Sequence, residues 1–443
     1  STTRWQARHS TSPVRSSQYA RQQRKSLQKA STANSYTHAD AEDAMVTTVT
    51  VEDAKAVIAE KAMTADAAVT KKHYMKTAIV ILNWNTERYL EQFLPPLLNS
   101  VKDIDGAEVI VADNASTDGS MKVMKEKFPE VRTIVFDKNY GFTGGYNRAL
   151  NQIEADCYVL MNSDVEVSEG WLEPLIAWMA AHPECGACAP KIRSWHKRDK
   201  FEYAGAAGGH IDRFGYPFCR GRVMGRTEKD KGQYDACLRE VFWVSGACMM
   251  VRSRLFHKLG GFDERFFAHM EEIDLCWKMQ LAGHTVCAVP ESVVYHIGGG
   301  TLPKNSPQKL FLNYRNNLLM FNNNLARTFA QYYYNLGNSA STAAAMGLDK
   351  AEKRMGTRLS LDTLSKYVYM LTFRFKDALA VRKAHKEFAS MYVRTDPKSI
   401  EEYLLKTGKL GINGVYRKWI ISRSILKGSR VFSYIKEKDF IKF

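Results

Sequence analysis

The sequence predicts an α/β protein with a parallel sheet, followed by a basic and mostly helical region. Three observations lead to this fold class. Short apolar runs alternate with longer amphipathic stretches from Thr77 onward, each run ends in a polar turn, and the chain beyond Gln308 combines helical patterns with an excess of basic residues. Strands that alternate with helices of about ten to fifteen residues are typical of βαβ units, whose parallel sheets carry helices on both faces.

The elements are expected in a definite order. Strands are predicted at residues 78–82, 108–112, 133–136 and 157–161, with helices between them at 88–101, 119–128 and 144–154. A helix-like pattern resumes at Gly170-Trp171, followed by strands within 240–251, a helix at 271–282 and a last strand ending at Tyr295-His296. Ligands of such sheets bind beyond the carboxyl ends of the strands. The first candidates for a site are therefore the turns at 83–85, 113–118, 137–141 and 162–164.

Residues 1–74 differ in composition from the rest of the chain. The first forty are rich in Ser, Thr, Gln, Arg and Ala, as a disordered tail would be, and 46–68 could form one weak helix. Met75 opens the first strong strand pattern. We therefore interpret residues 1–74 as a dispensable extension and Met75 as a natural start.

The charge of the chain is concentrated in its last third. Residues 303–443 hold 26 Lys and Arg against 10 Asp and Glu, which accounts for the whole formal net charge of +16. Such an asymmetry favours an acidic partner surface, either nucleic acid or the anionic face of a membrane. At 443 residues, 45% hydrophobic and 11% aromatic, the chain can also bury a sizeable core.

The cysteines and apolar runs bear on the compartment. Eight Cys are scattered without the density of a secreted disulfide scaffold, and Cys185-Gly186-Ala187-Cys188 has no second pair at zinc-site spacing. We expect these thiols to be packed and reduced. No run approaches the roughly 20 apolar residues of a membrane span, and the start has no secretory pattern. These features favour a cytoplasmic protein.

The polar turns contain side chains suited to a phosphorylated ligand. Asp164 and Glu166 follow a buried strand, where carboxylates could hold Mg²⁺ or Mn²⁺ or could be helix caps or solvated turns. The acidic turn at 113–120 could receive hydrogen bonds from a nucleobase or ribose, or be a capped turn. The Gly-rich turn at 139–147 could bring backbone N–H groups close to phosphate or ribose.

Eight motifs in order carry a resemblance to a known family. They are AIVILNWN, VIVADNASTDGS, NYGFTGGYNRAL, YVLMNSDVEV, WVSGACMMVRS, GGFDERFF, EEIDLCWKMQLAGH and YHIGGGT. The series resembles the family 2 glycosyltransferases of the GT-A fold, and within them the rhamnosyltransferase-like branch. It spans residues 77–323. The resemblance implies a GT-A catalytic domain at 75–323, with a Rossmann-like nucleotide-binding sheet and an acceptor half, and a basic helical region at 324–443.

The resemblance assigns the binding of the nucleotide-sugar donor. The D-x-D element of the family falls on Asn162-Ser163-Asp164, so Asp164 would hold Mn²⁺ or Mg²⁺ against the diphosphate, and His296 would complete the metal site. A structural role for His296 is the alternative. The remaining donor contacts would come from Leu82, Asn83, Trp84, Asn85, Asp113, Asn114, Gly141, Asn147 and Arg315, the last of which could instead lie on a surface helix.

The resemblance also assigns the catalytic base. The family's E-D pair falls on Glu271-Glu272, so Glu272 would take the proton of the acceptor hydroxyl although it is one methylene longer than the expected Asp. Trp243, Ser245 and Gly246 would flank a sugar, with Trp243 stacking on it or, alternatively, belonging to the core. Asp263 and Asp274 could support this region or cap helices.

The expected activity is inverting, metal-dependent sugar transfer to a lipid-linked or cell-surface polysaccharide acceptor. A dTDP-rhamnose donor is favoured, and UDP-linked hexoses, N-acetylhexosamines and galactofuranose remain alternatives. The stretches 359–375 and 415–435 are predicted to form basic amphipathic helices. Helices of this kind would bind anionic lipid and so place the protein on the inner face of the cell membrane. The alternatives for them are packing on the catalytic core and a homo-oligomer interface.

Two other functions compete with this one. One is a binding protein of the same fold without turnover, which the departures at Asn162 and Glu272 would permit. The other is a nucleic-acid-binding protein that uses the basic C-terminal region. We expect no nucleic-acid partner, because no zinc finger, RRM signature or similar recognition element is present in the sequence.

Overall fold

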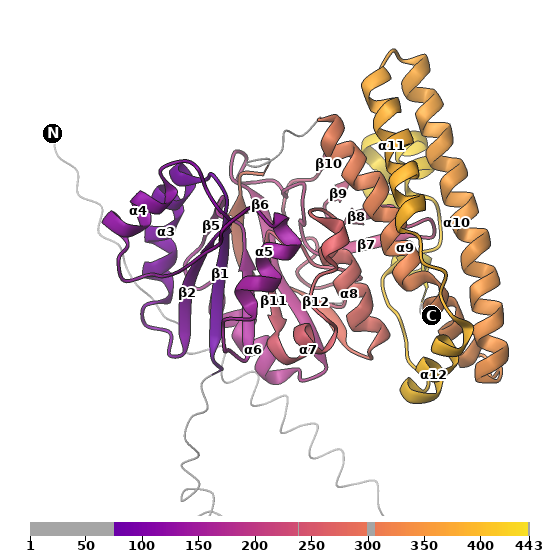
Figure 1. Ribbon diagram of the computed structural model, residues 1–443, viewed down its shortest axis with the longest axis horizontal. Coiled ribbons are helices and arrows are strands. Elements are labelled where there is room, and N and C mark those ends of the chain that lie inside the picture. The colour runs from indigo at the N-terminus through magenta and orange to yellow at the C-terminus, as the bar shows by residue number, and fades with distance from the viewer. Residues whose placement is uncertain (1–74, 238, 299–305, 442–443) are drawn as a thin grey trace, which may run out of the picture. The chain divides into compact units, whose positions relative to one another are not determined.

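The computed structural model describes residues 75–237, 239–298 and 306–441 (Figure 1). The expected helix at 46–68 and the proposed extension at 1–74 lie outside these ranges. The described residues from Met75 onward belong to one compact unit. Among them, no helix combines the length and apolar character needed to cross a membrane.

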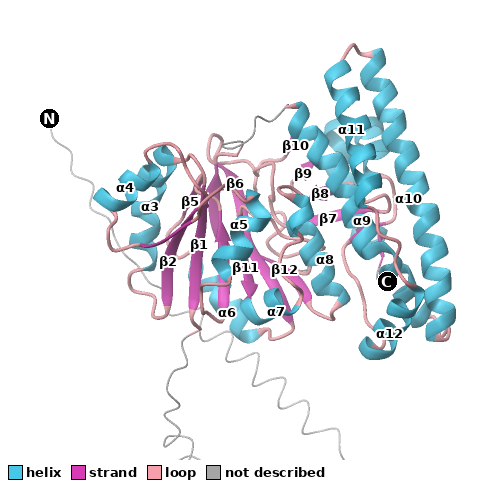
Figure 2. Cartoon of the chain, viewed as in Figure 1, coloured by secondary structure: helices cyan, strands magenta, loops and turns pink. Residues whose placement is uncertain are grey.

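An eight-stranded sheet forms the centre of the fold (Figure 2). Its spatial order is β3-β2-β1-β4-β11-β6-β12-β5, in which β5 and β11 run against the others. The strands are β1 Thr77–Asn83, β2 Ala107–Asp113, β3 Arg132–Val135, β4 Cys157–Met161, β5 Val165–Val167, β6 Cys185–Ser194, β11 Cys248–Arg252 and β12 Thr285–His296. The α/β class and the predicted strands at 78–161 are confirmed.

Helices cover both faces of this sheet because its strands are apolar on both sides. Ile79 and Ile81 of β1 belong to one buried cluster with Leu90 of α3, whereas Val80 belongs to the opposite cluster with Tyr146 of α5. The helices are α3 Glu87–Val101, α4 Ser120–Lys127, α5 Gly141–Leu150, α6 Leu172–Ala181, α7 Ser253–Lys258 and α8 Glu271–Leu281. The predicted helices thus form, within a few residues at their ends.

The strands expected within 240–251 form only in part, which corrects that prediction. Only Cys248–Arg252 forms a strand, and the residues before it make two isolated bridges, Glu240 with Cys287 and Trp243 with Gly209. The apolar residues of this stretch are buried in irregular backbone. The chain therefore turns at Ser245-Gly246 before it enters the sheet, which places these two residues at the edge of the sheet.

A second sheet joins distant parts of the chain. Its order is β10-β9-β8-β7-β13-β14, from β7 Gly209–Asp212, β8 Pro217–Cys219, β9 Arg222–Val223, β10 Arg226–Thr227, β13 Val415–Tyr416 and β14 Phe440–Ile441. β13 runs parallel to β7, and Asp212 Oδ2 accepts a 2.9 Å hydrogen bond from Ile420 N. The expected amphipathic helix at 415–435 therefore begins later, because Val415 and Tyr416 are buried strand residues. Its helical part consists of α13 Ile420–Lys427 and the 3-10 helix η2 Gly428–Tyr434.

The C-terminal helices pack on the part of the chain that forms the large sheet and its helices. They are α9 Pro307–Asn335, α10 Ala340–Leu371, α11 Phe375–Met391 and α12 Pro397–Thr407. α9 begins with Ser306, whose side chain accepts from Lys309 N, and it runs through the expected domain boundary at residue 323. Trp277 of α8 donates to Thr328 of α9 at 2.8 Å. The basic helical region is confirmed, and α9 belongs to both expected domains.

The cysteines are unpaired in the described chain. Cys185 and Cys188 lie in β6 and are buried, and both are free thiols, as are the other six. Burial raises the pKa of Cys248, Cys188 and Cys157. The expected packing of this CxxC pair is confirmed.

The contribution of Tyr416 to the packing of the second sheet can be tested by measuring the free energy of unfolding of variants. Tyr416 is fully buried beside Phe218, Val223 and Ile420, so Tyr416→Ala is expected to lower the free energy of unfolding by about 3–5 kcal/mol in urea titrations. Tyr416→Phe is the matched control and should cost nothing, because the buried hydroxyl has no hydrogen-bond partner among the described residues. Equal midpoints for Tyr416→Ala and the wild type would contradict this packing.

Candidate active site

The carboxyl ends of the parallel strands meet at one edge of the large sheet. Asn83 at the end of β1 donates from Nδ2 to Oδ1 of Asp113 at the end of β2, over 2.8 Å. Asn162, which follows β4, donates from its backbone N to Ala247 O at 3.0 Å. β12 ends at His296 on the same edge. Side chains from four strands are therefore brought together, as the parallel topology predicts.

The first two turns form a tight polar network. Asp113 is almost fully buried, and its Oδ2 accepts from Ser116 N at 2.9 Å, so the acidic turn is also a capped turn. Asn85, with a positive φ of 53°, accepts from Thr117 N at 2.7 Å. Trp84, which lies between Asn83 and Asn85 in the sequence, is 38% exposed, whereas Asn83 is buried. Of the residues expected at the base pocket, Trp84 thus presents the accessible aromatic surface, and Leu82 packs under Gly145.

The backbone groups of the Gly-rich turn form hydrogen bonds to other parts of the protein. Asn114 accepts from Tyr140 N at 2.9 Å and donates to Gly141 O at 2.9 Å, which joins β2 to the start of α5. Phe142 N and Thr143 N donate to Phe267 O at 2.8 and 3.3 Å. Gly141 has a φ of +73°, and a Cβ there would lie 2.5 Å from the Phe267 ring. In place of the expected approach to phosphate or ribose, these amides hold the segment that contains Phe267.

Asn147 has a similar internal role. Its Nδ2 donates to Phe262 O at 2.8 Å, and its Oδ1 accepts from Phe262 N at 3.0 Å. The side-chain amide is thus paired with the backbone of the GGFDE motif. These contacts form a clamp between α5 and that motif, and the expected contact of Asn147 with the donor stays a prediction.

Asp164, His296 and Glu202 form a buried chain of charges. The His296 Nε2 lies 3.1 Å from Asp164 Oδ1, and the His296 Nδ1 lies 3.4 Å from Glu202 Oε2. Gly298 N donates to the other Asp164 oxygen at 3.2 Å. Burial opposes the charged imidazolium, but the two carboxylates outweigh it and raise the pKa of His296 to about 10. The pKa values of Asp164 and Glu202 are lowered, since the imidazolium and backbone N–H groups outweigh their burial.

The donor set at Asp164 fits a hard divalent cation. A carboxylate oxygen and an imidazole nitrogen face each other, with Glu202 behind the second ring nitrogen, as in carboxylate–histidine–metal arrangements. Because the raised pKa keeps His296 protonated, a cation bound there would displace the proton from the imidazole nitrogen. Asn162 Nδ2 is 3.5 Å from the same imidazole nitrogen. No group of three His, Cys, Asp or Glu in the described ranges could hold a metal, so phosphate oxygens or water would supply the other ligands. Ser163 is buried between the two positions.

Glu166 has a different environment from Asp164. Its carboxylate accepts from Arg198 at 2.7 and 2.8 Å and from Trp195 Nε1 at 2.7 Å. These contacts anchor the segment after β6 to β5. Of the two carboxylates in this turn, only Asp164 faces His296.

Glu271 and Glu272 open helix α8 at the edge of the sheet. Each has a side-chain oxygen, Oε2, that is buried without a hydrogen-bond partner among the described residues. A Cβ on Gly246 would lie 3.7 Å from Glu272 Cβ, so the Ser245-Gly246 turn and the glutamate are in contact distance. Burial raises the pKa of Glu272 to about 7, and burial together with the Glu272 charge raises the pKa of Glu271 well above its ordinary value. Carboxyls with such raised pKa values suit proton transfer near neutral pH.

The segment before this glutamate pair is held by α9. Arg315 Nη2 donates to Arg265 O and Phe266 O at 3.0 and 2.9 Å, while its Nη1 pairs with Glu387 at 2.5 Å. Asn316 Nδ2 donates to Ala268 O at 2.8 Å and also to the carbonyls of residues 266 and 269. Arg315 is thus a buried residue and not the surface residue of the alternative expectation. Its guanidinium is buried and used by the protein itself.

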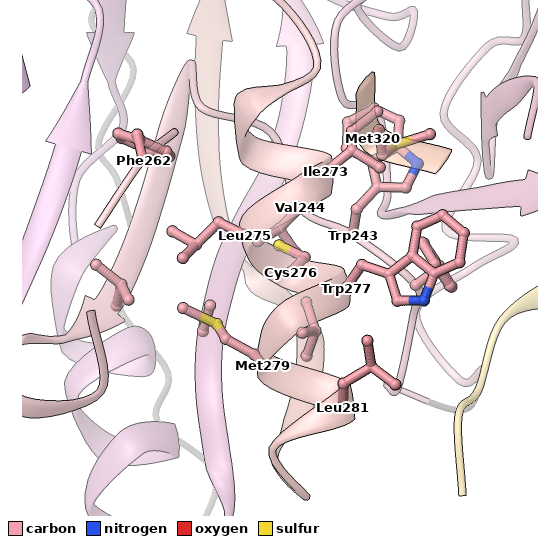
Figure 3. Packing of buried hydrophobic residues seen from close by; sticks show 14 of the residues in the cluster. Trp243, Val244, Phe262, Ile273, Leu275, Cys276, Trp277, Met279, Leu281 and Met320 are labelled. Atoms are coloured by element: carbon pink, nitrogen blue, oxygen red, sulfur yellow. The ribbon is translucent and has the colours of Figure 1, made fainter. Parts of the chain in front are cut away.

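The structure places Trp243 in the core (Figure 3). Its Nε1 donates to His210 O at 3.0 Å, and its ring covers Gly209, where a Cβ would lie 2.1 Å away. This corrects the expected stacking on a sugar and agrees with the core alternative. Ser245 is also buried, with its hydroxyl accepting from Ala247 N at 3.2 Å.

Glu202 was not identified from the sequence as a site residue. It follows β6 in an irregular segment, so no strand end or motif marked it. Asn316 follows Arg315 directly, and the resemblance to the family covers both residues. Asn323 donates to Asp263 and Asp274 at 3.1 and 3.0 Å, and Asp263 also caps the 3-10 helix η1 Glu264–Phe266, as the alternative expectation allowed.

Comparisons with known proteins agree with this geometry. A sequence profile of "Glycosyl transferase family 2" matches residues 78–260. An N-acetylglucosaminyl-diphospho-decaprenol L-rhamnosyltransferase of Mycobacterium tuberculosis is 30% identical over 236 residues, which cover 49% of this chain and 75% of the relative. The chain belongs to glycosyl transferase family 2. Within it, the chain falls in the rhamnosyltransferase-like branch, and it is a glycosyl transfer enzyme with a GT-A fold.

More distant relatives are found as well. An O-antigen biosynthesis protein of Myxococcus xanthus is 27% identical over 199 residues, 43% of this chain and 15% of that protein. A solved mannosyltransferase from Pyrobaculum calidifontis, in complex with GDP-Man and Mn²⁺, aligns with 76% of this chain and 95% of its own, at 14% identity and a TM-score of 0.43.

The buried glutamate pair predicts a stability that depends on pH. Because the folded pKa of Glu271 is raised above 4.5, the folded chain keeps a proton that the unfolded chain loses, and stability falls as pH rises above 4.5. At pH 8, urea titrations should therefore give Glu271→Gln a free energy of unfolding about 1–3 kcal/mol higher than that of the wild type. At pH 4 the two free energies should be equal. The exposed Glu130→Gln is the control. A difference that is the same at both pH values would show that charge burial is not its cause.

Proposed function

We propose that this enzyme transfers a sugar, with inversion, from a metal-bound nucleotide-sugar to a lipid-linked acceptor. The observation that supports this most directly is the pairing of two separate acidic features at one sheet edge. Asp164 with His296 offers ligands for a divalent cation, and Glu272 offers a carboxyl with a pKa near 7. An inverting transfer needs both of these features and no covalent nucleophile.

Each feature has a separate role in this proposal. Asp164 and His296 would hold Mn²⁺ or Mg²⁺, which supplies positive charge to the departing diphosphate. Glu272 would take the proton from the acceptor hydroxyl as that oxygen attacks the anomeric carbon. Trp84 would lie against the nucleobase, and Gly246, having no side chain, would leave room for the sugar next to Glu272.

The donor and acceptor are proposed from the relatives. The mycobacterial relative is named for L-rhamnosyl transfer to an N-acetylglucosaminyl-diphospho-decaprenol, so a dTDP-rhamnose donor and a lipid diphosphate acceptor are favoured here. Such an acceptor lies at a membrane surface. We therefore propose that the enzyme works on the inner face of the cell membrane, where the basic C-terminal region faces anionic lipid.

Donor turnover is the first test of this proposal. Nucleoside diphosphate release is measured from dTDP-rhamnose, UDP-glucose, UDP-N-acetylglucosamine and UDP-galactofuranose, with Mn²⁺, Mg²⁺ or EDTA, and with membrane extract as acceptor. Metal-dependent release from one donor is expected, and Asp164→Ala and Glu272→Gln should each lower the rate at least about 100-fold. Glu130→Gln should not. Lack of release from any donor would instead support a binding protein without turnover.

The same assay predicts a pH profile. A general base acts in its deprotonated form, so the rate of the wild type should fall about tenfold per pH unit below the Glu272 pKa of about 7 and level off above it. Within this pair the charge of Glu272 acts on Glu271, whose pKa it raises together with burial and the charge of Asp274. A rate that stays flat between pH 5 and pH 8 would contradict the assignment of Glu272 as the base.

Glu202 should affect the metal site without touching the sugar. Because it faces the His296 Nδ1 from 3.4 Å, Glu202→Gln should weaken Mn²⁺ binding about 10- to 100-fold, as measured by electron paramagnetic resonance in the presence of nucleoside diphosphate. The thermal midpoint of each variant is recorded in parallel. Unchanged Mn²⁺ affinity in a folded Glu202→Gln variant would remove Glu202 from the site.

A further inference from the structure

The turn between α10 and α11 presents a concentration of exposed apolar side chains. Leu371 is 80% exposed, Phe373 82%, Leu379 61% and Leu364 57%, and the stretch also exposes Phe375, Tyr367, Val368 and Met370. Singly exposed apolar residues are ordinary on soluble proteins, but a contiguous group on one helical hairpin is not. We name residues 364–379 the hairpin tip.

The hairpin tip is well ordered by its own hydrogen bonds. Phe373 N and Arg374 N donate to Met370 O and Tyr369 O at 3.1 and 2.8 Å, and Arg374 pairs with Asp377 at 2.7 Å. The rings of Phe373 and Phe375 meet edge to face, 6.1 Å apart. The apolar side chains are thus held outward by a rigid turn rather than by a loose loop.

Basic residues surround the apolar side chains. Between Leu364 and Lys386 the chain contains six Lys and Arg against Asp377 and no other acidic residue, and Asp377 is already paired with Arg374. Lys376, Arg382, Lys383 and Lys386 are exposed. This combination of exposed apolar and cationic side chains matches the interface of an anionic lipid bilayer.

The base of the hairpin is tied to the catalytic half near the site. Tyr314 of α9 meets Ser365 at 2.7 Å, and Phe311 and Leu312 pack on Ala380 and Ala384, so the tip lies beyond the first turns of α9. Those same turns hold the segment before Glu271 through Arg315 and Asn316. Figure 1 shows the turn between α10 and α11 at the end of the helical layer where α9 begins. The tip therefore projects from the side of the molecule that carries the active site.

We infer that the hairpin tip inserts into the interface of an anionic membrane and so brings the active site to a lipid-linked acceptor. The inference rests on the proposed function only for the identity of the acceptor. The insertion itself follows from the exposed residues, their rigid presentation and the surrounding cations. Among the basic C-terminal stretches, the α10–α11 turn is thus the element that enters the lipid.

Co-sedimentation with vesicles tests this inference on the full chain. One set of vesicles contains equal parts of phosphatidylcholine and phosphatidylglycerol, and the other contains phosphatidylcholine alone. Wild type should bind the anionic vesicles at least about tenfold more tightly than the neutral ones. Leu371→Ser/Phe373→Ser should bind the anionic vesicles at least about 100-fold more weakly than wild type, since two exposed side chains no longer enter the lipid.

Two control variants make the outcome decisive. Leu405→Ser changes a leucine of α12 that is 66% exposed, and it should bind as wild type does. Glu272→Gln should also bind normally, which separates membrane docking from turnover. Wild-type chain that stays in solution, or a hairpin variant that still binds, would overturn the inference. Loss of self-association in the hairpin variant with unchanged vesicle binding would overturn it in favour of a contact between two copies of the chain.

Discussion

Five consecutive carbonyl groups before α8 determine where the glutamate pair stands. Residues 264–266 form the short 3-10 helix η1 Glu264–Phe266, residues 267–269 have no regular structure, and three of the residues at 267–270 have positive φ. Each carbonyl from 265 to 269 nevertheless accepts a hydrogen bond, from Arg315, from Asn316 or from the first amides of α5. Buried backbone acceptors are costly to leave unpaired, so this unusual conformation depends on donors from two distant helices.

The same donors connect the two halves of the chain. Arg315 reaches Glu387 of α11, and Arg265 reaches Asn323 of α9, so the helical region is part of the frame of the active site rather than an appendage to it. The opposite side of the site is fixed by the buried chain from Asp164 through His296 to Glu202. These two supports hold the Asp164–His296 pair and the Glu271–Glu272 pair, the two features on which the proposed transfer depends.

The sequence was informative where a local rule applies and less so where long-range contacts decide. Strand and helix alternation predicted the parallel sheet, and parallel topology then predicted that Asn83, Asp113 and Asp164 would share one edge. Trp243 and Arg315 show the limit of that reasoning. A tryptophan after an irregular stretch and an arginine on a helix have several partners available, and only the folded chain shows that His210, Phe266 and Glu387 take them. Glu202 was missed because its partner His296 is supplied by another strand.

The pairing of β7 with β13 has a kinetic consequence. Asp212 and Ile420, which are hydrogen-bonded at the junction of these strands, are 208 residues apart in the chain. Closing so long a loop is slow, and contacts of this kind form late in folding. Until β13 docks, β7 is an open sheet edge on an otherwise assembled protein, and such edges readily pair with other chains. The protein is therefore most prone to aggregate in the interval between formation of the large sheet and arrival of residues 415–441.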